Sequence, residues 1–540
     1  MTLGDLLLGA ADRYGDRDAL VFPDTRLTYA ELAEAAREHA RSLVALGIEP
    51  GEHVGILMPN CPEFIELLFG IVLAGGVAVT VNARYKADEL AYVVENSDLA
   101  ALVTSSLASE YVDFAGLLRD ALPGLSDAPE PRALNLGAAP RLRFVTRIGE
   151  ATPSGFLPFE AFRQAAADVG LAAVERRRLA VRPADPGIMM YTSGTTSNPK
   201  GCPLAHAKLV ESGVKMNRER YFLTPEDRFW APLPMFHMAA VLPLVACIEA
   251  GSALLSMNRF DAGVALEVME REGATVAFPA FPTVTNELVS HSDFASTDLS
   301  RLRRINNIAP LEMLRRFQEA FPQAVQTGAY GMTELTGVIA YNHPDEDLES
   351  RLTTCGRPFS GIEVKIVDPD SLEELPTGQR GEIWVRGYAV FDGYYKSPEK
   401  NAECFVDGWF RTGDLCSVDD AGRIAYHGRI KDMLKVGGEN VAAVEIESWL
   451  ATHPAVKMAQ VIGVPDERLL EVAAAYIELE AGAEATEDDI IGYCKGRIAS
   501  FKVPRHVRFV DEWPMSSTKV QKFRLREMFD ASSQPGRPGR

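Results

Sequence analysis

The chain is 540 residues long, which is more than one ordinary hydrophobic core can organise, so two or more domains are expected. Its 47% of hydrophobic and 24% of charged residues are typical of a soluble globular protein and exclude a fibrous or disordered one. The formal net charge of −20 argues against nucleic acid or an anionic membrane as a bulk partner, so any anionic ligand must be held by local donors.

The cysteines and the apolar segments indicate a reducing, aqueous compartment. The seven cysteines form no Cys-x-x-Cys pair, so they predict neither a disulfide framework nor a zinc site. The N-terminus has no basic stretch ahead of an apolar run, which argues against a signal peptide. The most apolar segment, Leu67–Val81, is broken by Gly75 and Gly76 and is too short to span a bilayer. We therefore expect a cytoplasmic protein without stable membrane insertion.

The first hundred residues alternate between helical and strand patterns. Thr28 and Glu31 form a capping box at the start of a helix that runs to Gly47. The expected elements that follow are the strand Val54–Met58, a helix from Pro62 to Ala74, and the strands Val77–Val81 and Leu99–Thr104. Strand, helix and strand joined by short connections predict a parallel sheet covered on both faces.

The alternation continues after a Pro-rich and Gly-rich stretch over residues 120–140, which we interpret as a surface excursion. The expected elements are the strand Gly187–Tyr191, the helix Leu204–Val214, the strand Phe229–Pro232, the helix Val241–Glu249, the strand Ala274–Phe278, the helix Leu311–Ala320 and the strand Glu363–Val367. Short strands with glycine turns then extend from Gly381 to Tyr426.

The region after His427 has the pattern of a small α+β domain. Its expected elements are the strand Met433–Val436, the helix Ala443–Thr452, the strands Lys457–Val464 and Glu471–Glu480, the helix Glu487–Ala499 and the strand Val507–Val510. The fold class is therefore α/β, with a large N-terminal domain of parallel and mixed sheets (residues 1–428) and a small α+β C-terminal domain (429–530). Residues 531–540 have nothing to bury and are expected to be disordered.

The stretch Met189–Gly201 has the side chains needed to hold phosphate. Glycines let a backbone approach an anion, hydroxyls donate to phosphate oxygens, and a lysine supplies a compact charge. The residues concerned are Thr192, Ser193, Gly194, Thr195, Thr196, Lys200 and Gly201. The stretch is not a Walker A loop, because Lys200 precedes Gly201 instead of following it. The alternative is a polar surface turn.

The residues Tyr191–Gly201 resemble the phosphate loop of the adenylate-forming superfamily, which includes acyl-CoA synthetases, firefly luciferase and peptide-synthetase adenylation domains. Tyr330-Gly-Met-Thr-Glu334 resembles the second signature of that superfamily. The resemblance implies that the Tyr330 ring packs on adenine, that Thr333 meets the α-phosphate and that Glu334 holds magnesium, a metal that prefers carboxylate oxygen. The alternative for Glu334 is a solvated surface acid.

Further nucleotide contacts are implied by the same resemblance. Thr412-Gly-Asp414 together with Gly428-Arg429 resembles the clamp on the ribose hydroxyls, in which a carboxylate accepts from the two hydroxyls beside an arginine. The other implied contacts come from Ile308, Ala309, Pro310, Ala329, Gly331, Met332 and Tyr426.

The C-terminal motifs imply a mobile domain. In Gly428–Val441, Lys431 matches the position at which family members hinge between the large and the small domain. Lys435, Gly437 and Gly438 match the loop that lines the tunnel for the pantetheine arm of CoA. Lys519 matches the lysine that reaches the α-phosphate during adenylation. The segment departs from the family pattern because its usual glycine is missing, so Lys522 remains the alternative.

The acid pocket is implied to be lined from Phe236–Met238, Phe278–Phe281, Asn306–Ile308 and Gly328–Ala329. His237 is a candidate to gate the pocket or to meet the carboxylate, and the alternative is a structural histidine. Asn307, Ile308 and Ala329 replace smaller residues of many relatives, which disfavours very long fatty acids, and Asn306 and Asn307 are candidates to meet a polar group. The phosphate stretch and the segment Lys435–Asn440 also resemble those of carnitine-CoA and crotonobetaine-CoA ligases. A substrate with a quaternary ammonium group would need an aromatic cage, and the sequence shows no identifiable one.

Together these motifs indicate an ATP-dependent acid–CoA ligase that uses ATP, Mg2+ and coenzyme A. A carboxylic acid of short, medium or functionalised type would react with ATP to give acyl-AMP and pyrophosphate, and CoA would then release AMP and form the thioester. One alternative is a stand-alone adenylation enzyme that loads a carrier protein. The other is a ligase-like protein that binds nucleotide without turnover. The sequence leaves a homodimer open.

Overall fold

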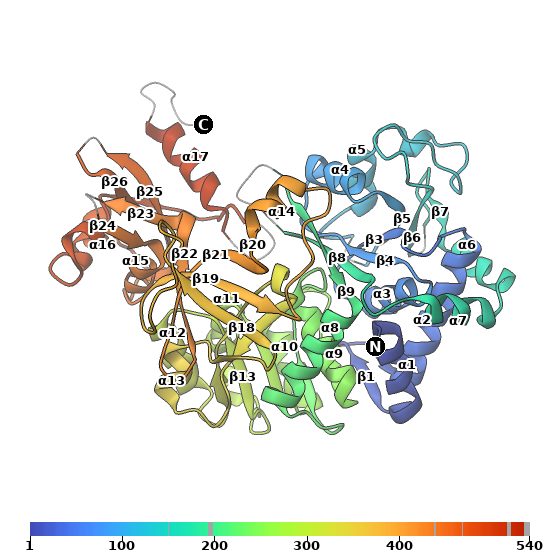
Figure 1. Ribbon diagram of the computed structural model, residues 1–540, viewed down its shortest axis with the longest axis horizontal. Coiled ribbons are helices and arrows are strands. Elements are labelled where there is room, and N and C mark those ends of the chain that lie inside the picture. Colours follow the sequence, from blue (N-terminus) through green and yellow to red (C-terminus); the bar gives the residue numbers. More distant parts are fainter. Residues whose placement is uncertain are drawn as a thin grey trace.

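The computed structural model describes residues 1–107, 109–149, 151–192, 198–436, 439–466, 468–515 and 520–533. Figure 1 shows the C-terminal strands and helices gathered at one end of the molecule, beside a larger body built from the preceding part of the chain. The larger body contains two sheets of seven strands each and two smaller sheets.

The first large sheet has the strand order β7-β6-β5-β3-β4-β8-β9. Its strands are parallel except for β9, which forms an antiparallel hairpin with β8. The strands are β3 (His53–Leu57), β4 (Val77–Thr80), β5 (Leu99–Ser105), β6 (Phe144–Ile148), β7 (Leu157–Pro158), β8 (Pro186–Thr192) and β9 (Lys200–Ala205). The associated helices are α1 (Leu3–Tyr14), α2 (Tyr29–Ala45), α3 (Pro62–Leu73), α4 (Ala87–Asn96), α5 (Phe114–Ala121), α6 (Phe159–Gln164) and α7 (Leu171–Ala180).

The second large sheet has the order β14-β13-β12-β10-β11-β1-β2, and all its neighbours are parallel except β1 and β2. The strands are β1 (Asp18–Val21), β2 (Arg26–Thr28), β10 (Arg228–Trp230), β11 (Ala253–Leu255), β12 (Val276–Ala280), β13 (Arg304–Asn307) and β14 (Val325–Thr327). The helices are α8 (His206–Met216), α9 (Met238–Ala250), α10 (Ala262–Glu272), α11 (Pro282–Ser290), α12 (Leu311–Ala320) and α13 (Leu348–Thr353).

The two large sheets share one core. Helices α1, α2, α3, α8 and α9 contribute to the same buried cluster as apolar residues from both sheets, which places this helical layer between them. The outer face of the first sheet is covered by α4 and α5, and the outer face of the second by α10 and its neighbours. Strands buried on both faces explain the continuous apolar runs in the sequence.

The remaining strands form three smaller sheets. One contains β15 (Ala329–Met332), β16 (Gly337–Tyr341) and β17 (Arg357–Pro358). The next contains β18 (Ile362–Val367), β19 (Gly381–Gly387), β20 (Phe405–Val406), β21 (Trp409–Val418) and β22 (Ile424–Arg429), with α14 (Pro398–Cys404) before β20. The last contains β23 (Met433–Val436), β24 (Glu439–Ala442), β25 (Val456–Asp466), β26 (Leu470–Leu479) and β27 (His506–Phe509), with helices α15 (Ala443–Leu450), α16 (Glu487–Cys494) and α17 (Lys522–Ser533).

The predicted fold class is confirmed, and several elements differ from their predicted bounds. The predicted helix over Leu204–Val214 is wrong at its start, because β9 continues to Ala205 and α8 begins at His206. Helix α17 extends through Ser533, so the predicted disordered tail is wrong for residues 531–533, and its remainder, 534–540, lies outside the described residues. The helix predicted to reach Ala499 ends at Cys494. Among the described residues, no helix combines the length and the apolar character needed to cross a membrane.

Asn60 ties together the ends of the two large sheets. It follows β3, and its side-chain amide donates to the carbonyl oxygen of Leu233 at 2.8 Å and accepts from the backbone N–H of Met235 at 2.8 Å. Leu233 and Met235 follow β10 in the other sheet. Asn60 is 5% exposed, so both backbone groups depend on it for hydrogen bonding away from water.

We expect Asn60→Ala to lower the free energy of unfolding by about 3 kcal/mol, because it leaves two buried backbone groups unpaired. Asn258→Ala, a substitution at an exposed position, should change it by less than about 0.5 kcal/mol. Urea unfolding followed by circular dichroism compares the variants. Equal stability of the two variants would show that Asn60 does not connect the sheets.

Candidate active site

Side chains from the Tyr330–Glu334 segment and from the strand pair that carries Asp414 and Arg429 meet at Asp414. The hydroxyl of Tyr330, on β15, donates to Asp414 Oδ2 at 2.8 Å. Arg429 pairs with Asp414 Oδ1 through its Nε at 2.6 Å. Asp414 on β21 and Arg429 at the end of β22 are direct partners in the antiparallel ladder, so strand register alone places the two side chains together.

The Asp414 carboxylate is buried and held in a fixed orientation. It is 2% exposed, and its backbone N–H donates to Thr412 Oγ1 at 3.0 Å. The Thr412 hydroxyl in turn donates to the carbonyl of Ile383 on β19 at 2.8 Å. Burial alone would lower the pKa of Arg429, but the neighbouring Asp414 carboxylate outweighs it and raises that pKa above its usual value. The Asp414 carboxyl therefore lies beside a charged guanidinium, and its oxygens can accept hydrogen bonds from hydroxyl groups.

Two tyrosine rings lie beside this pair. The ring centroids of Tyr330 and Tyr426 are 6.2 Å apart with an interplanar angle of 31°. Burial, followed by the Asp414 carboxylate, raises the pKa of Tyr330 well above its usual value, so its hydroxyl stays a donor. Tyr330 is 5% exposed whereas Tyr426 is 42% exposed, so Tyr426 offers the more accessible aromatic surface.

Glu334 lies in the tight turn between β15 and β16. The turn is a single 3-10 turn, Thr333–Leu335, followed by Thr336 with a φ of 52° and Gly337 with a φ of 95°. Glu334 is 5% exposed, and its Oε1 accepts a hydrogen bond from the Tyr394 hydroxyl at 2.7 Å. It is therefore not a solvated surface acid, because burial of a carboxylate is costly unless it has partners.

The buried carboxylate of Glu334 suits a hard cation that takes most of its other ligands from a nucleotide. Within the described part of the chain, no group of three or more His, Cys, Asp and Glu residues is arranged to hold a metal ion by itself. Magnesium is commonly bound through one or two carboxylates together with phosphate oxygens and water. A single buried carboxylate such as that of Glu334 fits this mode.

The flanks of the phosphate stretch are described, whereas most of the stretch is not. Thr192 ends β8, Lys200 begins β9, and the two residues are paired in the hairpin. Ser193, Gly194, Thr195 and Thr196 lie outside the described residues. Burial and then the charge of Lys400 lower the pKa of Lys200, while Glu334 acts in the opposite direction, which places Lys200 within electrostatic reach of the Glu334 carboxylate.

The residues expected beside the nucleotide base differ in accessibility. Ile308 is 44% exposed and is fixed through its backbone N–H, which donates to the carbonyl of Ala280 at 2.7 Å. Ala309, Pro310, Met332 and Thr333 are half-buried, and Ala329 is buried. A side chain at Gly331 would place its Cβ 1.9 Å from the carbonyl oxygen of Gly337. The close pairing of β15 with β16 therefore requires glycine at this position.

The acid-pocket residues belong to the central core. Met238, Phe278, Ala280 and Ala329 share one buried cluster. His237 precedes α9, is half-buried and has its ring centroid 4.8 Å from that of Phe236. Both asparagines have partners inside the protein, and their expected contact with a polar group of the acid stays a prediction. Asn306 donates to Thr327 at 2.9 Å; Asn307 donates to Gln326 at 3.0 Å and accepts from Thr285 at 2.5 Å.

The C-terminal candidates divide into described and undescribed residues. Lys431 and Lys435 are exposed, and the Lys435 N–H donates to Glu471 at 2.8 Å. Gly437, Gly438 and Lys519 lie outside the described residues. Lys522, the alternative to Lys519, pairs with Glu447 of α15 at 2.6 Å, and both side chains are mostly buried. This ion pair lies inside the C-terminal domain, and the choice between Lys519 and Lys522 stays a prediction.

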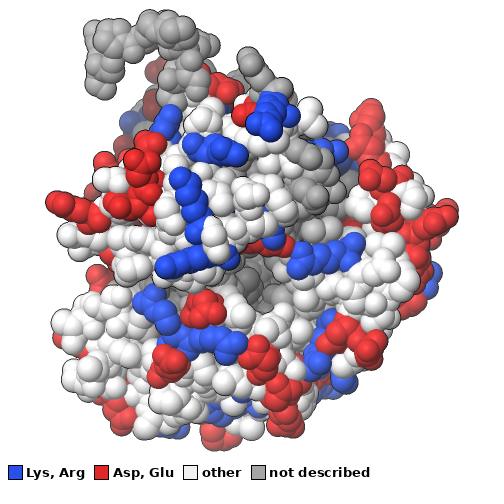
Figure 2. Space-filling view, turned by 90° about the vertical axis from the view of Figure 1, so that its left-hand side faces the viewer, with Lys and Arg blue, Asp and Glu red and all other residues white. Residues whose placement is uncertain are grey.

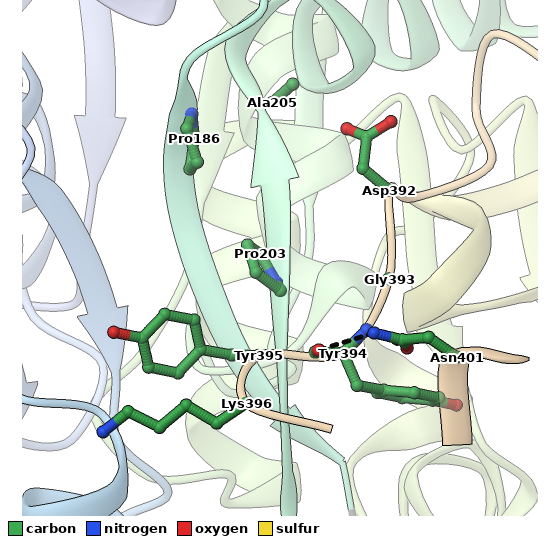
Figure 3. A pocket seen from close by; sticks show the side chains of 9 residues that line it. All are labelled: Pro186, Pro203, Ala205, Asp392, Gly393, Tyr394, Tyr395, Lys396 and Asn401. Atoms are coloured by element: carbon green, nitrogen blue, oxygen red, sulfur yellow. Dashed lines mark hydrogen bonds between the residues drawn. The ribbon is translucent and has the colours of Figure 1, made fainter. Parts of the chain in front are cut away.

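Tyr394 is the site residue that sequence reasoning missed. The available signal was the tyrosine pair in Asp392-Gly-Tyr-Tyr-Lys396, directly after a glycine turn. Tyr394 and Tyr395 line a cavity of about 300 Å³ together with Pro186, Pro203 and Ala205 of the β8–β9 hairpin. Figure 3 shows these side chains. This cavity does not include Asp414, Arg429 or Tyr330.

The comparisons with known proteins agree with this arrangement. The AMP-binding enzyme family model matches residues 8–395, and the model of the AMP-binding enzyme C-terminal domain matches residues 445–519. YngI of Bacillus subtilis (strain 168), which is named provisionally as an acyl-CoA synthetase, is 38% identical over 546 residues, covering 98% of each chain. The mitochondrial medium-chain acyl-CoA ligase ACSF2 of Rattus norvegicus is 32% identical over 541 residues, covering 98% of this chain and 88% of that protein.

Solved structures show the same fold. The anthranilate CoA ligase AuaEII, in complex with anthranoyl-AMP, aligns with a TM-score of 0.86 at 27% identity over 99% of this chain and 98% of its own. The family model covers well over half of the 540 residues, and the relatives match nearly the whole length. The chain therefore belongs to the AMP-binding enzyme family, that is, to the adenylate-forming superfamily, in its acid–CoA ligase branch.

Proposed function

We propose that the protein is an ATP-dependent acid–CoA ligase that activates a short, medium or functionalised carboxylic acid. The observation that carries the proposal is the convergence of Tyr330, Asp414 and Arg429, because it unites two nucleotide motifs and the start of the C-terminal domain around one buried carboxyl group. An acid–CoA ligase needs a nucleotide site of this kind at the border of its two domains.

The first step joins the acid to AMP. The carboxylate oxygen attacks the α-phosphorus of ATP, and pyrophosphate leaves. Asp414 would accept from the ribose hydroxyls, Tyr426 and Tyr330 would flank the adenine, and Thr333 would donate to the α-phosphate. Magnesium, when bound, neutralises charge on the phosphate oxygens, and Glu334 would hold it. Lys519 would stabilise the charge that develops on the α-phosphate.

The second step transfers the acyl group to CoA. The thiol sulfur attacks the acyl carbon, AMP leaves and the thiol proton is released. We propose that residues 429–530 turn about Lys431 between the two steps, so that Lys519 withdraws and the segment from Lys435 to Gly438 faces the pantetheine arm. In the present arrangement Arg380, before β19, bonds to Glu445 of α15 at 2.6 Å. Such a turn would have to break this ion pair.

The surface charge supports an anionic ligand. Figure 2 shows Lys and Arg side chains gathered around a hollow in the middle of one face, whereas most Asp and Glu side chains lie toward its edges. In a protein with a formal net charge of −20, a local concentration of cations favours binding of a phosphorylated ligand at that place.

The size of the acid is part of the proposal. Phe236, Phe278 and Ala329 are buried, and the residues at 307 and 308 are larger than glycine, which supports a short cavity. The relatives named for a medium-chain acyl group and for anthranilate support the same range. Pyrophosphate release with acids of increasing length, with and without CoA, tests the function. Turnover that requires CoA supports the ligase. The absence of pyrophosphate release with every acid tested would exclude it.

We expect Asp414→Asn to raise the KM for ATP about thirtyfold, which corresponds to the loss of about 2 kcal/mol from a charged hydrogen bond. Asp419→Asn is the matched control, because Asp419 follows the same strand and pairs with Arg423 instead. It should leave the KM for ATP unchanged. Initial rates of pyrophosphate release at varied ATP give both values. A wild-type KM in Asp414→Asn would contradict the ribose role.

We expect Lys519→Ala to slow adenylation about a hundredfold or more, because it removes the cation at the α-phosphate, yet to convert preformed acyl-AMP and CoA to thioester at the wild-type rate. Lys522→Ala should keep adenylation, since Lys522 is paired with Glu447. Separate assays of the two half-reactions distinguish the variants. Loss of adenylation in Lys522→Ala alone would transfer the role to Lys522.

A further inference from the structure

A short segment joins the Glu334 turn to the hairpin that carries the phosphate stretch. We call residues 389–395 the strap; it lies between β19 and α14. On one side, the carbonyl of Ala389 accepts from the Thr336 hydroxyl at 2.6 Å, and the N–H of Phe391 donates to the carbonyl of Glu334 at 2.8 Å. On the other side, the N–H of Tyr395 donates to the carbonyl of Gly201 at 2.8 Å.

The strap is anchored to the body of the protein. Lys208 of α8 donates through Nζ to the carbonyl of Val390 at 2.6 Å and to Asp392 Oδ1 at 2.6 Å. Phe391 is 2% exposed and packs in the central core. Because charged hydrogen bonds and a buried ring fix the segment at two points, its backbone is a rigid support for the residues that follow.

The backbone of Tyr394 is held from both sides by one residue. Asn401 of α14 accepts from the Tyr394 N–H at 2.7 Å and donates to the Tyr394 carbonyl at 3.0 Å, as Figure 3 shows. Gly393 has a φ of 128°, and a Cβ there would lie 2.9 Å from Asn401 Nδ2. The turn before Tyr394 thus requires glycine, which permits the close approach of Asn401.

The Tyr394 side chain extends from this support to Glu334. Its ring meets Phe391 edge-on, with centroids 4.8 Å apart, and its hydroxyl donates to Glu334 Oε1 at 2.7 Å. Among the residues that the structure describes, Tyr394 is the one side chain that donates to this carboxylate. A carboxylate fixed through one oxygen presents the other in a defined direction, as outer-sphere partners do at metal sites.

We propose that Tyr394 is a positioning residue, which orients the Glu334 carboxylate toward the magnesium ion of the bound nucleotide. Through the strap, the same contact keeps Glu334 in register with Lys200 and Gly201 at the foot of the phosphate stretch. The proposal rests on the nucleotide site of the proposed function. It does not depend on which acid the enzyme activates.

The test measures metal binding directly. Mn2+ replaces Mg2+, a non-hydrolysable ATP analogue replaces ATP, and electron paramagnetic resonance follows bound Mn2+. We expect Tyr394→Phe to weaken Mn2+ binding about tenfold, as is typical when an outer-sphere partner of a metal ligand is lost. Mg2+ titrations of pyrophosphate release should show the same shift in half-saturation, with an unchanged KM for the acid.

Tyr395→Phe is the matched control. It removes one hydroxyl from the same strap, but that hydroxyl donates to Asp98 at 2.8 Å, away from Glu334. Mn2+ binding in this variant should equal that of the wild type. Equal Mn2+ binding by wild type and Tyr394→Phe, or equal weakening in both tyrosine variants, would overturn the proposal.

A second variant separates orientation from folding. Asn401→Ala keeps the Tyr394 hydroxyl but removes the two hydrogen bonds that hold the Tyr394 backbone. Because the hydroxyl is then less well oriented, we expect Mn2+ binding about threefold weaker. The double variant Asn401→Ala/Tyr394→Phe should bind Mn2+ no worse than Tyr394→Phe, because both changes act through one contact. Additive weakening would contradict the proposal. Circular dichroism and thermal midpoints confirm that each variant is folded.

The outcomes also separate the two proposals. A wild type that binds Mn2+ with the nucleotide analogue but releases no pyrophosphate with any acid would refute the ligase function alone. A wild type with full turnover and an unchanged Mn2+ affinity in Tyr394→Phe would refute the positioning role alone. A wild type that binds no Mn2+ with the analogue would refute both.

Discussion

The candidate site depends on the ion pair between Asp414 and Arg429. The two residues are opposite each other on β21 and β22, and Tyr330 completes the cluster from β15 in a separate sheet. A buried carboxylate is costly without compensating partners, and here the arginine and the tyrosine hydroxyl together compensate the burial of Asp414. Because Arg429 is the last residue of β22, the same pair fixes the point at which the chain leaves for the C-terminal domain.

The layers of the fold bring the other groups to this place. Helices α1, α2, α3, α8 and α9 fill the space between the two large sheets, and Asn60 connects the loops that follow β3 and β10. The hairpin β8–β9 ends beside the turn that carries Glu334, and the strap joins the two. Ligands of open α/β sheets bind at the carboxyl ends of strands, where such loops gather.

The C-terminal end of the chain forms a unit with its own core, as the proposed turn between the two steps requires. Its own core is formed by β23 to β27 with α15 and α16, and a second small cluster includes α17. Lys522 forms an ion pair with Glu447 inside this unit, at 2.6 Å. Arg380 precedes Lys431 in the chain and Glu445 follows it, and the two side chains form an ion pair. Because the pair is partly exposed to water, breaking it costs little free energy.

The sequence by itself determined the fold class, most element positions and the identity of the nucleotide motifs, because these depend on local periodicity, on capping residues such as Thr28 and on short spacings such as Tyr330 to Glu334. Only the tertiary structure decided that β9 continues to Ala205, since strand pairing with β8 overrides the helical pattern there. It also decided the internal bonding of Asn306 and Asn307 and the pairing of Lys522. The contact between Tyr394 and Glu334 joins residues 60 positions apart, and no local pattern encodes such a contact, because it arises from the packing of separate sheets.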